Sequence, residues 1–495
     1  MRTRIVPGAA TVVGVLALTA LGCAINPATG KRQLSFISES QEVQMGRVGS
    51  RQVEQSMGLY PDAKVQSFVE SMGLRLARTS ERSNLPWNFK VVDDPVVNAF
   101  ALPGGFIFVT RGIMSHLNSE AELAQVMGHE IGHVTARHSV EQISRAQLLQ
   151  SGFGVASVFA PAATYRFGGL LSNGLGLLFL KYSRGDERQA DRLGVRYALR
   201  AGFDPRQAVK VYEMLERQEE QAGGRGVPGW LSTHPTPEHR VERLHAQVDT
   251  IPPARLKSAR VGHDSFLKLL DGMVYGKNPR NGFFRDGRFL QPDLKFRFDF
   301  PEGWKTRNLA QSVAALSPRR DAILELSFAE VPGNREAARA FLTQQGISST
   351  DIRGESINGY PATTGRFSAR TQQGTLSGVA AFLDYGGATY QIVGYTARRL
   401  SAYERTFWAA IRSFDELTDP SALSVKPMRI EVITTRVPVS ISNLTLNRPS
   451  PISTAELALL NGVLEDDVIP AGTKIKWVNG DKPPGSDEPS DRESR

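Results

Sequence analysis

The chain has 495 residues, of which 41% are hydrophobic and 22% charged, so it can build several hydrophobic cores and is not a disordered or fibrous protein. Its formal net charge of +9 is modest for this length, and no dense run of Lys and Arg carries interleaved aromatic residues. These features argue against a nucleic-acid-binding protein.

The amino terminus has the three-part layout of a secretory signal. Two arginines precede an apolar run over residues 5–20, and the only cysteine of the chain, Cys23, follows a Leu-Gly pair. We therefore expect residues 1–22 to be a signal peptide and Cys23 to carry a lipid after cleavage. Ala20 stands where lipoproteins more often have Leu, so a plain cleaved signal and a short uncleaved anchor are the alternatives.

Ala24 sets the expected destination of a lipidated chain. Ala24 directly follows the cysteine, where an Asp would indicate a different destination. By resemblance to Gram-negative lipoproteins, Ala24 predicts sorting to the outer membrane, facing the periplasm. Several acyl chains would hold the protein firmly, because one chain alone gives only marginal anchoring.

A strand is expected from Asn98 onward. The stretch NAFALPGG, residues 98–105, is followed by the apolar run from Phe106 to Thr110. Its alternation is short, so the residues alone predict an internal β-strand.

A long helix is predicted to begin near Glu120. Ser119 can cap it, and Glu122, three residues later, can complete a capping box. The apolar face of this helix is formed by Leu123, Val126, Met127 and Val134.

This helix carries the HExxH motif His129-Glu130-Ile131-Gly132-His133. Helical residues four apart differ by only ~40° around the axis and ~6 Å along it, so both imidazoles can bind one metal ion. Glu130 then lies beside the water that the metal activates and can take its proton. The motif predicts one zinc ion per chain and peptide hydrolysis.

A hydrolytic zinc site needs a third protein ligand and an open position. The metzincin extension is absent, because Ala136 and Ser139 stand where Gly and His are required. His138 is expected to point away from the side of the helix that carries the HExxH histidines. The third ligand must therefore come from elsewhere in the chain.

Glu187 is the best candidate for this ligand. It stands at the start of a second predicted helix that runs towards Gly202. Asp191 lies one turn further on the same face, where it can accept a hydrogen bond from a ligand imidazole and fix its tautomer. The alternative is an acidic first turn favoured only by the helix dipole.

The apolar segment from Leu148 to Leu180 separates the two predicted helices. Tyr165 and Arg166 divide it into pieces shorter than the ~20 residues of a membrane-spanning helix. From the residues alone we expect core helices, with glycines that permit bends.

HExxH, the later sequence SRxxExxAD from Ser183 to Asp191, and NAFALPGG together resemble the gluzincin metallopeptidase family of the CAAX-prenyl-protease and HtpX type, in its periplasmic BepA-like lipoprotein branch. The resemblance covers residues 25–244. It implies that the zinc ligands are His129, His133 and Glu187, that the general base is Glu130 and that the supporting acid is Asp191.

The resemblance also gives the strand at 98–110 a function. In such enzymes this strand pairs with an extended substrate beside the metal, which places Asn98 and Phe106 in the substrate-binding region.

His234-Pro235 and Arg240 match a later part of the family pattern, in which a His-Pro is followed by an Arg. The resemblance implies that His234 lies near the zinc and that Arg240 braces the substrate-binding site. Two roles for His234 stay open: it stabilises the tetrahedral oxyanion, or it occupies the open coordination position in a closed state. From the residues alone, Thr236 and Pro237 also read as the start of a helix.

The remainder of the chain predicts accessory domains. Alternating apolar residues at 294–300, a strand at 322–328, and three further strands between 361 and 396 indicate an antiparallel sheet. Helices are expected at 335–345 and 403–414. This part resembles small PsbP-like domains.

Residues 428–478 form the last predicted module. Its second half resembles a LysM glycan-binding repeat, but Val437-Pro438-Val439-Ser440 stands where such repeats carry Gly-Asp-Thr. Peptidoglycan attachment and a structural or partner-docking role are both open.

The predicted fold class is therefore α+β multidomain: a mainly α-helical zincin peptidase domain with a small edge sheet, an antiparallel α+β domain and a LysM-like module. The expected parts are a signal peptide 1–22, a zinc metallopeptidase domain 23–253, a linker 254–290, a PsbP-like accessory domain 291–420, a LysM-like module 427–480 and a disordered tail 481–495.

The predicted function is that of a zinc-dependent endopeptidase in envelope protein quality control. Its expected substrates are unfolded or misassembled envelope proteins, with the membrane contacted through Cys23 and with peptidoglycan or the outer-membrane assembly machinery as further candidate partners. The alternatives are a periplasmic chaperone or assembly adaptor with a plugged zinc site, and a hydrolase of peptidoglycan peptides.

Overall fold

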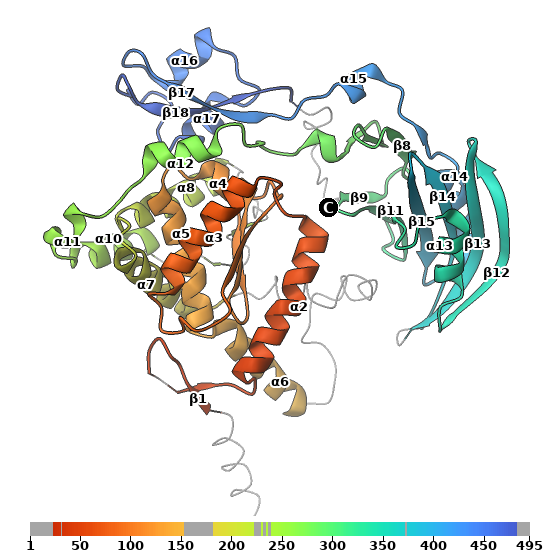
Figure 1. Ribbon diagram of the computed structural model, residues 1–495, viewed down its shortest axis with the longest axis horizontal. Helices are drawn as coiled ribbons and strands as arrows, with labels where there is room; N and C mark the ends of the chain where they lie inside the picture. The colour runs from red at the N-terminus through yellow and green to blue at the C-terminus, as the bar shows by residue number, and fades with distance from the viewer. Residues whose placement is uncertain are drawn as a thin grey trace, which may run out of the picture.

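The computed structural model describes residues 23–30, 32–152, 182–221, 229–230, 234–235, 239–371 and 374–482. It has three parts, which we call the helical domain (37–270), the α+β domain (283–416) and the C-terminal module (428–479) (Figure 1). The predicted signal peptide 1–22, residues 153–180 of the apolar segment, the predicted helix start at Thr236 and Pro237, and residues 483–495 of the tail lie outside the described residues.

The helical domain has a small sheet among its helices, as predicted. Its helices are α2 (Glu39–Met57), α3 (Ala63–Ala77), α4 (Arg111–His116), α5 (Glu120–Thr135), α6 (His138–Gly152), α7 (Arg184–Arg200), α8 (Gln207–Gln221), α10 (Arg240–Asp249), α11 (Pro253–Lys257) and α12 (His263–Leu270). Its sheet has the order β3 (Asn88–Val92), β5 (Phe106–Thr110), β4 (Ala99–Leu102), with β3 parallel and β4 antiparallel to β5. A hairpin of β1 (Cys23–Ile25) and β2 (Arg32–Leu34) precedes α2.

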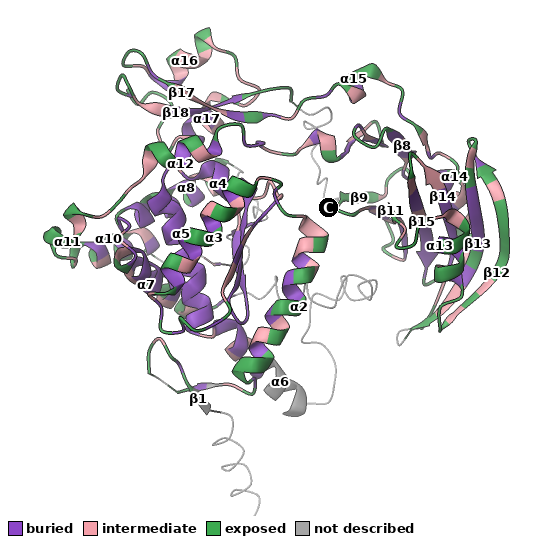
Figure 2. Cartoon of the chain, viewed as in Figure 1, coloured by how far each residue is buried: buried purple, intermediate pink, exposed green. Residues whose placement is uncertain are grey.

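Helix α5 lies at the centre of the helical domain, and all its residues are buried (Figure 2). Helices α3, α7 and α8 pack against it. Glycines allow α7 to come close, because a Cβ atom on Gly194 would lie 2.9 Å from the backbone nitrogen of His129. A larger residue at Gly194 would push the two helices apart.

The start of α5 differs in one detail from the predicted capping box. Ser119 is the N-cap, and its side chain accepts a hydrogen bond from the backbone N–H of Glu122 at 3.1 Å. The Glu122 carboxylate accepts the backbone N–H of Asn118 at 2.6 Å, one residue earlier than a capping box requires. Glu122 therefore ties α5 to the turn that precedes it.

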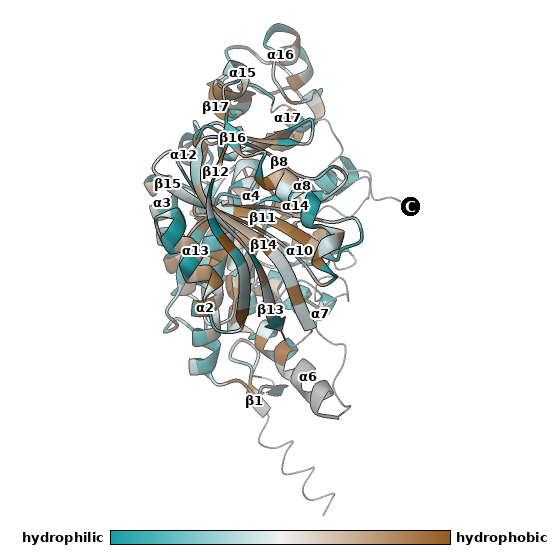
Figure 3. Ribbon diagram, turned by 90° about the vertical axis from the view of Figure 1, so that its right-hand side faces the viewer, coloured by the Kyte–Doolittle hydropathy of each residue, from teal (hydrophilic) through white to brown (hydrophobic). Residues whose placement is uncertain are grey.

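The α+β domain has a seven-stranded antiparallel sheet, which agrees with the predicted class. Its order is β12 (Ile347–Ile357), β13 (Tyr360–Thr371), β14 (Gly374–Tyr385), β15 (Ala388–Thr396), β11 (Ala322–Phe328), β10 (Ser312–Leu316), β9 (Lys305–Asn308). Figure 3 views the molecule from the side of this domain. Helix α13 (Asn334–Leu342) packs on β13 and β14, and α14 (Glu404–Ile411) also contacts β14.

A second sheet connects this domain to the rest of the chain. Its order is β16 (Asp415–Glu416), β8 (Phe296–Asp299), β7 (Arg288–Gln291), β6 (Phe283–Arg285). The short helices η2 (Pro279–Asn281), η3 (Leu400–Ala402) and α15 (Pro420–Leu423) lie in the connections.

The C-terminal module consists of paired strands and two short helices. Strands β17 (Arg429–Thr434) and β18 (Lys474–Asn479) are antiparallel, and α16 (Ile441–Asn447) and α17 (Thr454–Leu460) lie between them in the chain. Trp477, Leu457 and Leu460 belong to the same hydrophobic core as Ile113 and Leu117 of the helical domain. The module and the helical domain therefore share one core.

The two segments that connect the α+β domain to the rest of the chain, one before it and one after it, run side by side. The backbone N–H of Gly272 donates to the Ile430 carbonyl at 2.8 Å, and the N–H of Ile430 donates to Met273 at 2.8 Å. Arg280 donates to the Leu423 carbonyl at 2.7 Å further out. The α+β domain is thus inserted between two segments that pair with each other (Figure 1).

Across the residues with described structure, no helix is both long enough and apolar enough to cross a membrane.

His116, in the last turn of α4, generates a prediction about stability and pH. Its Nδ1 lies 2.8 Å from the Gly112 carbonyl, and burial lowers its pKa to about 4, against the opposing effect of that hydrogen bond. The unfolded chain binds a proton at His116 below about pH 6.5, whereas the folded chain does not until about pH 4. His116 therefore removes stability as the pH falls from 6.5 to 4.

We expect the metal-free protein to lose about 2 kcal/mol more stability than a His116→Gln variant between pH 7 and pH 5. Urea unfolding of both proteins at the two pH values measures this difference. Equal losses in the two proteins would show that His116 titrates normally in the fold.

Candidate metal centre

Four side chains from three segments converge in the helical domain. His129 and His133 come from α5, Glu187 comes from α7, and His234 comes from the segment before α10. One ligand atom of each lies within 4.8 Å of all the others, and all four residues are buried. The predicted ligands are therefore brought together, and His234 joins them.

The ligand atoms face a common point. The Nε2 atoms of His129 and His133 are 3.0 Å apart, and Glu187 oxygens lie 3.4 Å and 3.3 Å from these two nitrogens. His234 Nδ1 lies 2.9 Å from Glu187 Oε1 and 3.3 Å from His129 Nε2. The close approach of α5 and α7 produces this arrangement.

Asp191 orients a ligand, as its position on the helix predicts. His129 Nδ1 lies 2.9 Å from Asp191 Oδ1, so a proton on Nδ1 donates to the carboxylate and leaves the Nε2 lone pair for a metal. The Tyr212 hydroxyl donates to the same oxygen at 2.8 Å. Arg240 donates to both Asp191 oxygens at 2.7 Å and 3.0 Å, and to Glu187 at 3.2 Å.

Arg240 therefore lies against the carboxylates of Asp191 and Glu187. Its guanidinium lies 3.9 Å from the centre of the Tyr212 ring, and its side chain is 1% exposed. At this depth it neutralises and fixes the two carboxylates, and it shares Asp191 Oδ1 and Glu187 Oε2 with His129.

The prediction for His138 is wrong. Its Nδ1 lies 2.9 Å from His133 Nδ1, so it contacts the back of a ligand ring. The reason is the turn after α5, where Arg137 has φ 58° and starts a new helix direction. Helical geometry extrapolated beyond Thr135 placed His138 on the wrong side.

Glu130 is buried beside the cluster. Both of its carboxylate oxygens lack a hydrogen-bond partner within the part of the chain that the structure describes, and its Oε1 lies 3.6 Å from His234 Nε2. Burial raises its pKa, against the opposing charges of His234 and His129. A buried carboxylate with free oxygens is suited to accept a proton.

Two aromatic rings cover the histidines and were not predicted. Tyr182 stacks on His133 with ring centres 3.8 Å apart, and its hydroxyl lies 2.9 Å from Ser139 Oγ. Trp230 stacks on His234 at 4.5 Å. The only signal in the sequence was that Tyr182 directly precedes Ser183 and that Trp230 stands one helical turn before His234.

The predicted substrate strand corresponds to two strands of the small sheet, β4 and β5. Strand β5, which contains Phe106, lies between β3 and β4, so both of its edges are already paired. The Phe106 ring packs in a cluster with Val53 and Phe100. Among the described strands of this sheet, β3 and β4 are the outer ones: β3 is bridged to Leu59, whereas β4, whose residues are buried, directly follows Asn98.

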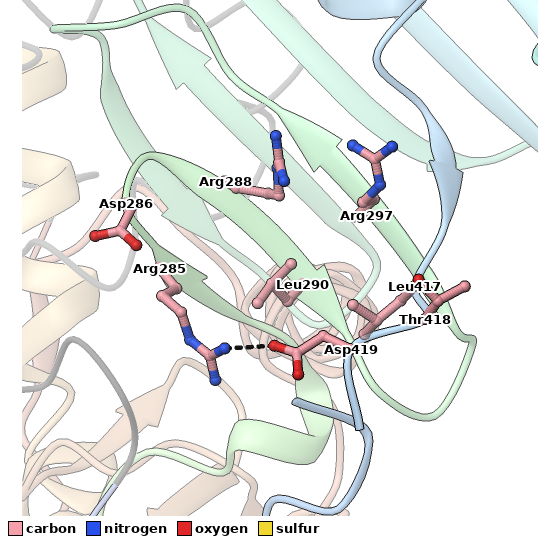
Figure 4. A pocket seen from close by; sticks show the side chains of 8 residues that line it. All are labelled: Arg285, Asp286, Arg288, Leu290, Arg297, Leu417, Thr418 and Asp419. Atoms are coloured by element: carbon pink, nitrogen blue, oxygen red, sulfur yellow. Dashed lines mark hydrogen bonds and ion pairs between the residues drawn. The ribbon is translucent and has the colours of Figure 1, made fainter. Parts of the chain in front are cut away.

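The α+β domain has a separate pocket with a cavity of about 350 Å³ (Figure 4). Its arginines are already paired: Arg285 with Asp419 at 2.6 Å, Arg297 with Asp415 at 2.6 Å, and Arg288 with Asp299 at 2.5 Å. None of its lining residues belongs to the metal cluster, so the pocket is not part of that centre.

The donor set fits zinc. Two imidazoles and one carboxylate are the ligands of many catalytic zinc sites, and His234 supplies a fourth donor. Burial opposes a charge on His129, yet Asp191 and Glu187 raise its pKa to about 9, so the site attracts positive charge. Burial also opposes the charge of Glu187, but His234, His129 and His133 hold its pKa well below the usual range.

The sequence has relatives with this chemistry. The profile of Peptidase family M48 matches residues 63–248. The chain is 32% identical over 240 residues to the mitochondrial metalloendopeptidase OMA1 of Schizosaccharomyces pombe, an alignment that covers 47% of this chain and 67% of the relative. It is 31% identical over 298 residues to the beta-barrel assembly-enhancing protease of Escherichia coli strain K12, covering 58% and 57%.

A third relative, the mitochondrial metalloendopeptidase OMA1 of Arabidopsis thaliana, is 37% identical over 204 residues, covering 39% of this chain and 38% of the relative. The chain thus spans between 38% and 67% of the length of these three relatives. The residues matched by the family profile, 63–248, include all four residues of the metal cluster. The chain therefore belongs to Peptidase family M48, the zinc-using metalloendopeptidases that include these relatives.

Proposed function

We propose that this protein is a zinc-dependent endopeptidase of the bacterial cell envelope that acts in protein quality control. The observation that carries the proposal is the buried Glu130 carboxylate, free of hydrogen bonds from the described residues, next to a cluster of zinc donors. A site that only bound metal would not need this carboxylate.

Zinc bound by His129, His133 and Glu187 would supply a Lewis acid that polarises water and the scissile carbonyl. Glu130 takes the proton of the attacking water and then gives it to the leaving amine. Asp191 and Arg240 keep the ligands in their orientation, and the stacked Tyr182 limits the access of bulk water.

The place of β4 as an outer strand, paired by a strand on one side only, supports binding of an extended peptide. Backbone N–H and C=O groups on an edge strand pair with any peptide main chain, whatever its side chains. This mode suits unfolded proteins, because folded proteins keep their backbone groups paired.

The setting is proposed from the amino terminus and from one relative. A lipid on Cys23 would hold the protein at the outer membrane, facing the periplasm, and the Escherichia coli relative is named for the assembly of β-barrels. Misassembled envelope proteins are therefore the substrates we propose.

We expect Glu130→Gln to lower the turnover of an unfolded protein substrate at least about a hundredfold, because the amide cannot accept the proton. Zinc content and thermal stability should stay close to those of the original protein. Casein cleavage and metal analysis measure both effects, and Glu213→Gln, an exposed position on α8, is the control. Undiminished cleavage by the Glu130→Gln variant would falsify the proposed mechanism.

His234 in the cluster supports a closed form of the site. Its Nδ1 lies 2.9 Å from Glu187 Oε1, which leaves no room for a water molecule between the two atoms. We therefore propose that His234 closes the site and leaves it when substrate binds.

We expect His234→Ala to raise the rate of casein cleavage severalfold, because the position that His234 occupies opens. A role in stabilising the oxyanion predicts the opposite, a loss of about a hundredfold or more. Initial rates at saturating substrate distinguish the two, with the exposed His245→Ala as the control.

A further inference from the structure

The C-terminal module places a buried lysine under the turn that leads into the metal-binding helix. Lys476, on β18, is fully buried, and its Nζ donates to the carbonyls of Ser115 at 2.7 Å and Leu117 at 2.8 Å. These carbonyls belong to the last turn and the end of α4, where a helix leaves acceptors without partners. Lys476 therefore caps α4 from another part of the chain.

Burying a lysine is costly unless it is well paired. Burial lowers the pKa of Lys476 to about 7, against the opposing charge of Glu122. The carboxylate of Glu122 in turn binds the N–H of Asn118 at 2.6 Å. Lysine, carbonyls and carboxylate thus form one polar group inside the core that the module shares with the helical domain.

The side chain of Asn461 holds Lys476 in place. Its Oδ1 accepts the backbone N–H of Lys476 at 2.7 Å, and its Nδ2 donates to the carbonyl of Lys476 at 2.9 Å. Around this point, Arg217 of α8 donates to Val463 at 2.7 Å, and Tyr275 donates to Glu456 at 2.8 Å. The module is therefore fixed to the helical domain on several sides.

The turn from Leu117 to Ser119 links the small sheet, where we propose that substrate binds, to the metal-binding helix α5. Strand β5, which pairs with the edge strand β4, leads through α4 into this turn, and α5 with its two histidines follows. Leu117 and Ser119 both have extended backbone, and their helical bonds, from the Leu117 N–H to Ile113 and from the Leu123 N–H to Ser119, run back into their own helices and do not join α4 to α5. The groups that hold the turn from outside it are Lys476, on the carbonyls of Ser115 and Leu117, and Glu122, on the N–H of Asn118.

We propose that Lys476 is a positioning residue for peptide hydrolysis: through Ser115, Leu117 and Glu122, the C-terminal module sets the alignment of α5 with the substrate-binding sheet. This inference rests on the proposed function. It assigns the module a role inside the peptidase itself, whatever else the module binds.

The test compares Lys476→Met with Lys474→Met in the full chain. Lys474 lies on the same strand, but it is 38% exposed and pairs with the exposed Asp264, so it serves as the matched control. Three quantities are measured: kcat and KM for casein, zinc affinity by competition with a chelator, and the melting temperature.

We expect Lys476→Met to lower kcat about tenfold or more at a temperature where the variant is fully folded, with KM within about twofold, because a small misalignment of the reacting groups acts on the chemical step. Zinc affinity should fall about tenfold, as it does when the groups that orient metal ligands are removed. Lys474→Met should leave both values unchanged.

A Lys476→Met variant that melts at a lower temperature, but keeps the kcat and zinc affinity of Lys474→Met, would overturn the proposal and leave Lys476 with a role in stability alone. If Lys476→Met does not fold, Asn461→Ala decides with the same measurements, because it loosens Lys476 without removing its charge. The zinc measurement does not need catalysis. An unmodified protein that cleaves no casein would therefore count against the proposed function, while the inference on Lys476 would still be judged by metal affinity.

Discussion

The close packing of α5 on α7 is the constraint on which the site depends. Gly128 and Gly194 meet backbone to backbone, so the two helices lie closer than larger side chains would permit. At this distance the Glu187 carboxylate reaches both imidazoles of the HExxH motif. For His129, His133 and Glu187, the metal centre is thus a product of helix packing.

Buried groups of opposite charge contact one another at the cluster. The carboxylates of Glu187 and Asp191 contact both the histidines and Arg240, and every one of these groups is buried. A buried negative pair that is only partly neutralised by one arginine favours a cation between the imidazoles. The same arrangement leaves Glu130 outside the network, with its oxygens available for proton transfer.

The sequence was most informative where periodicity and chemistry agree. The helix from Glu120 and its two histidines one turn apart could be predicted because both follow from helical geometry, whereas the roles of Glu187 and Asp191 were implied by the resemblance of SRxxExxAD to the family. His138 could not, because a single residue with positive φ at Arg137 redirects the chain. Tyr182 and Trp230 were missed because stacking on a ring depends on tertiary packing, which leaves no period in the sequence. Phe106 was assigned to substrate binding by resemblance, and the central place of its strand β5 could not be foreseen because strand order cannot be read from one strand's composition.

The shared core has a consequence for biosynthesis. Trp477 and Val478 fill the same hydrophobic core as residues of α3 and α5, although some 340 positions of chain separate α5 from them. The helical domain cannot complete its packing until residue 478 has emerged, by which time the inserted α+β domain can already have folded by itself. The helix that carries the HExxH histidines lies in this core, so its final packing waits for module residues that are more than three hundred positions away in the chain.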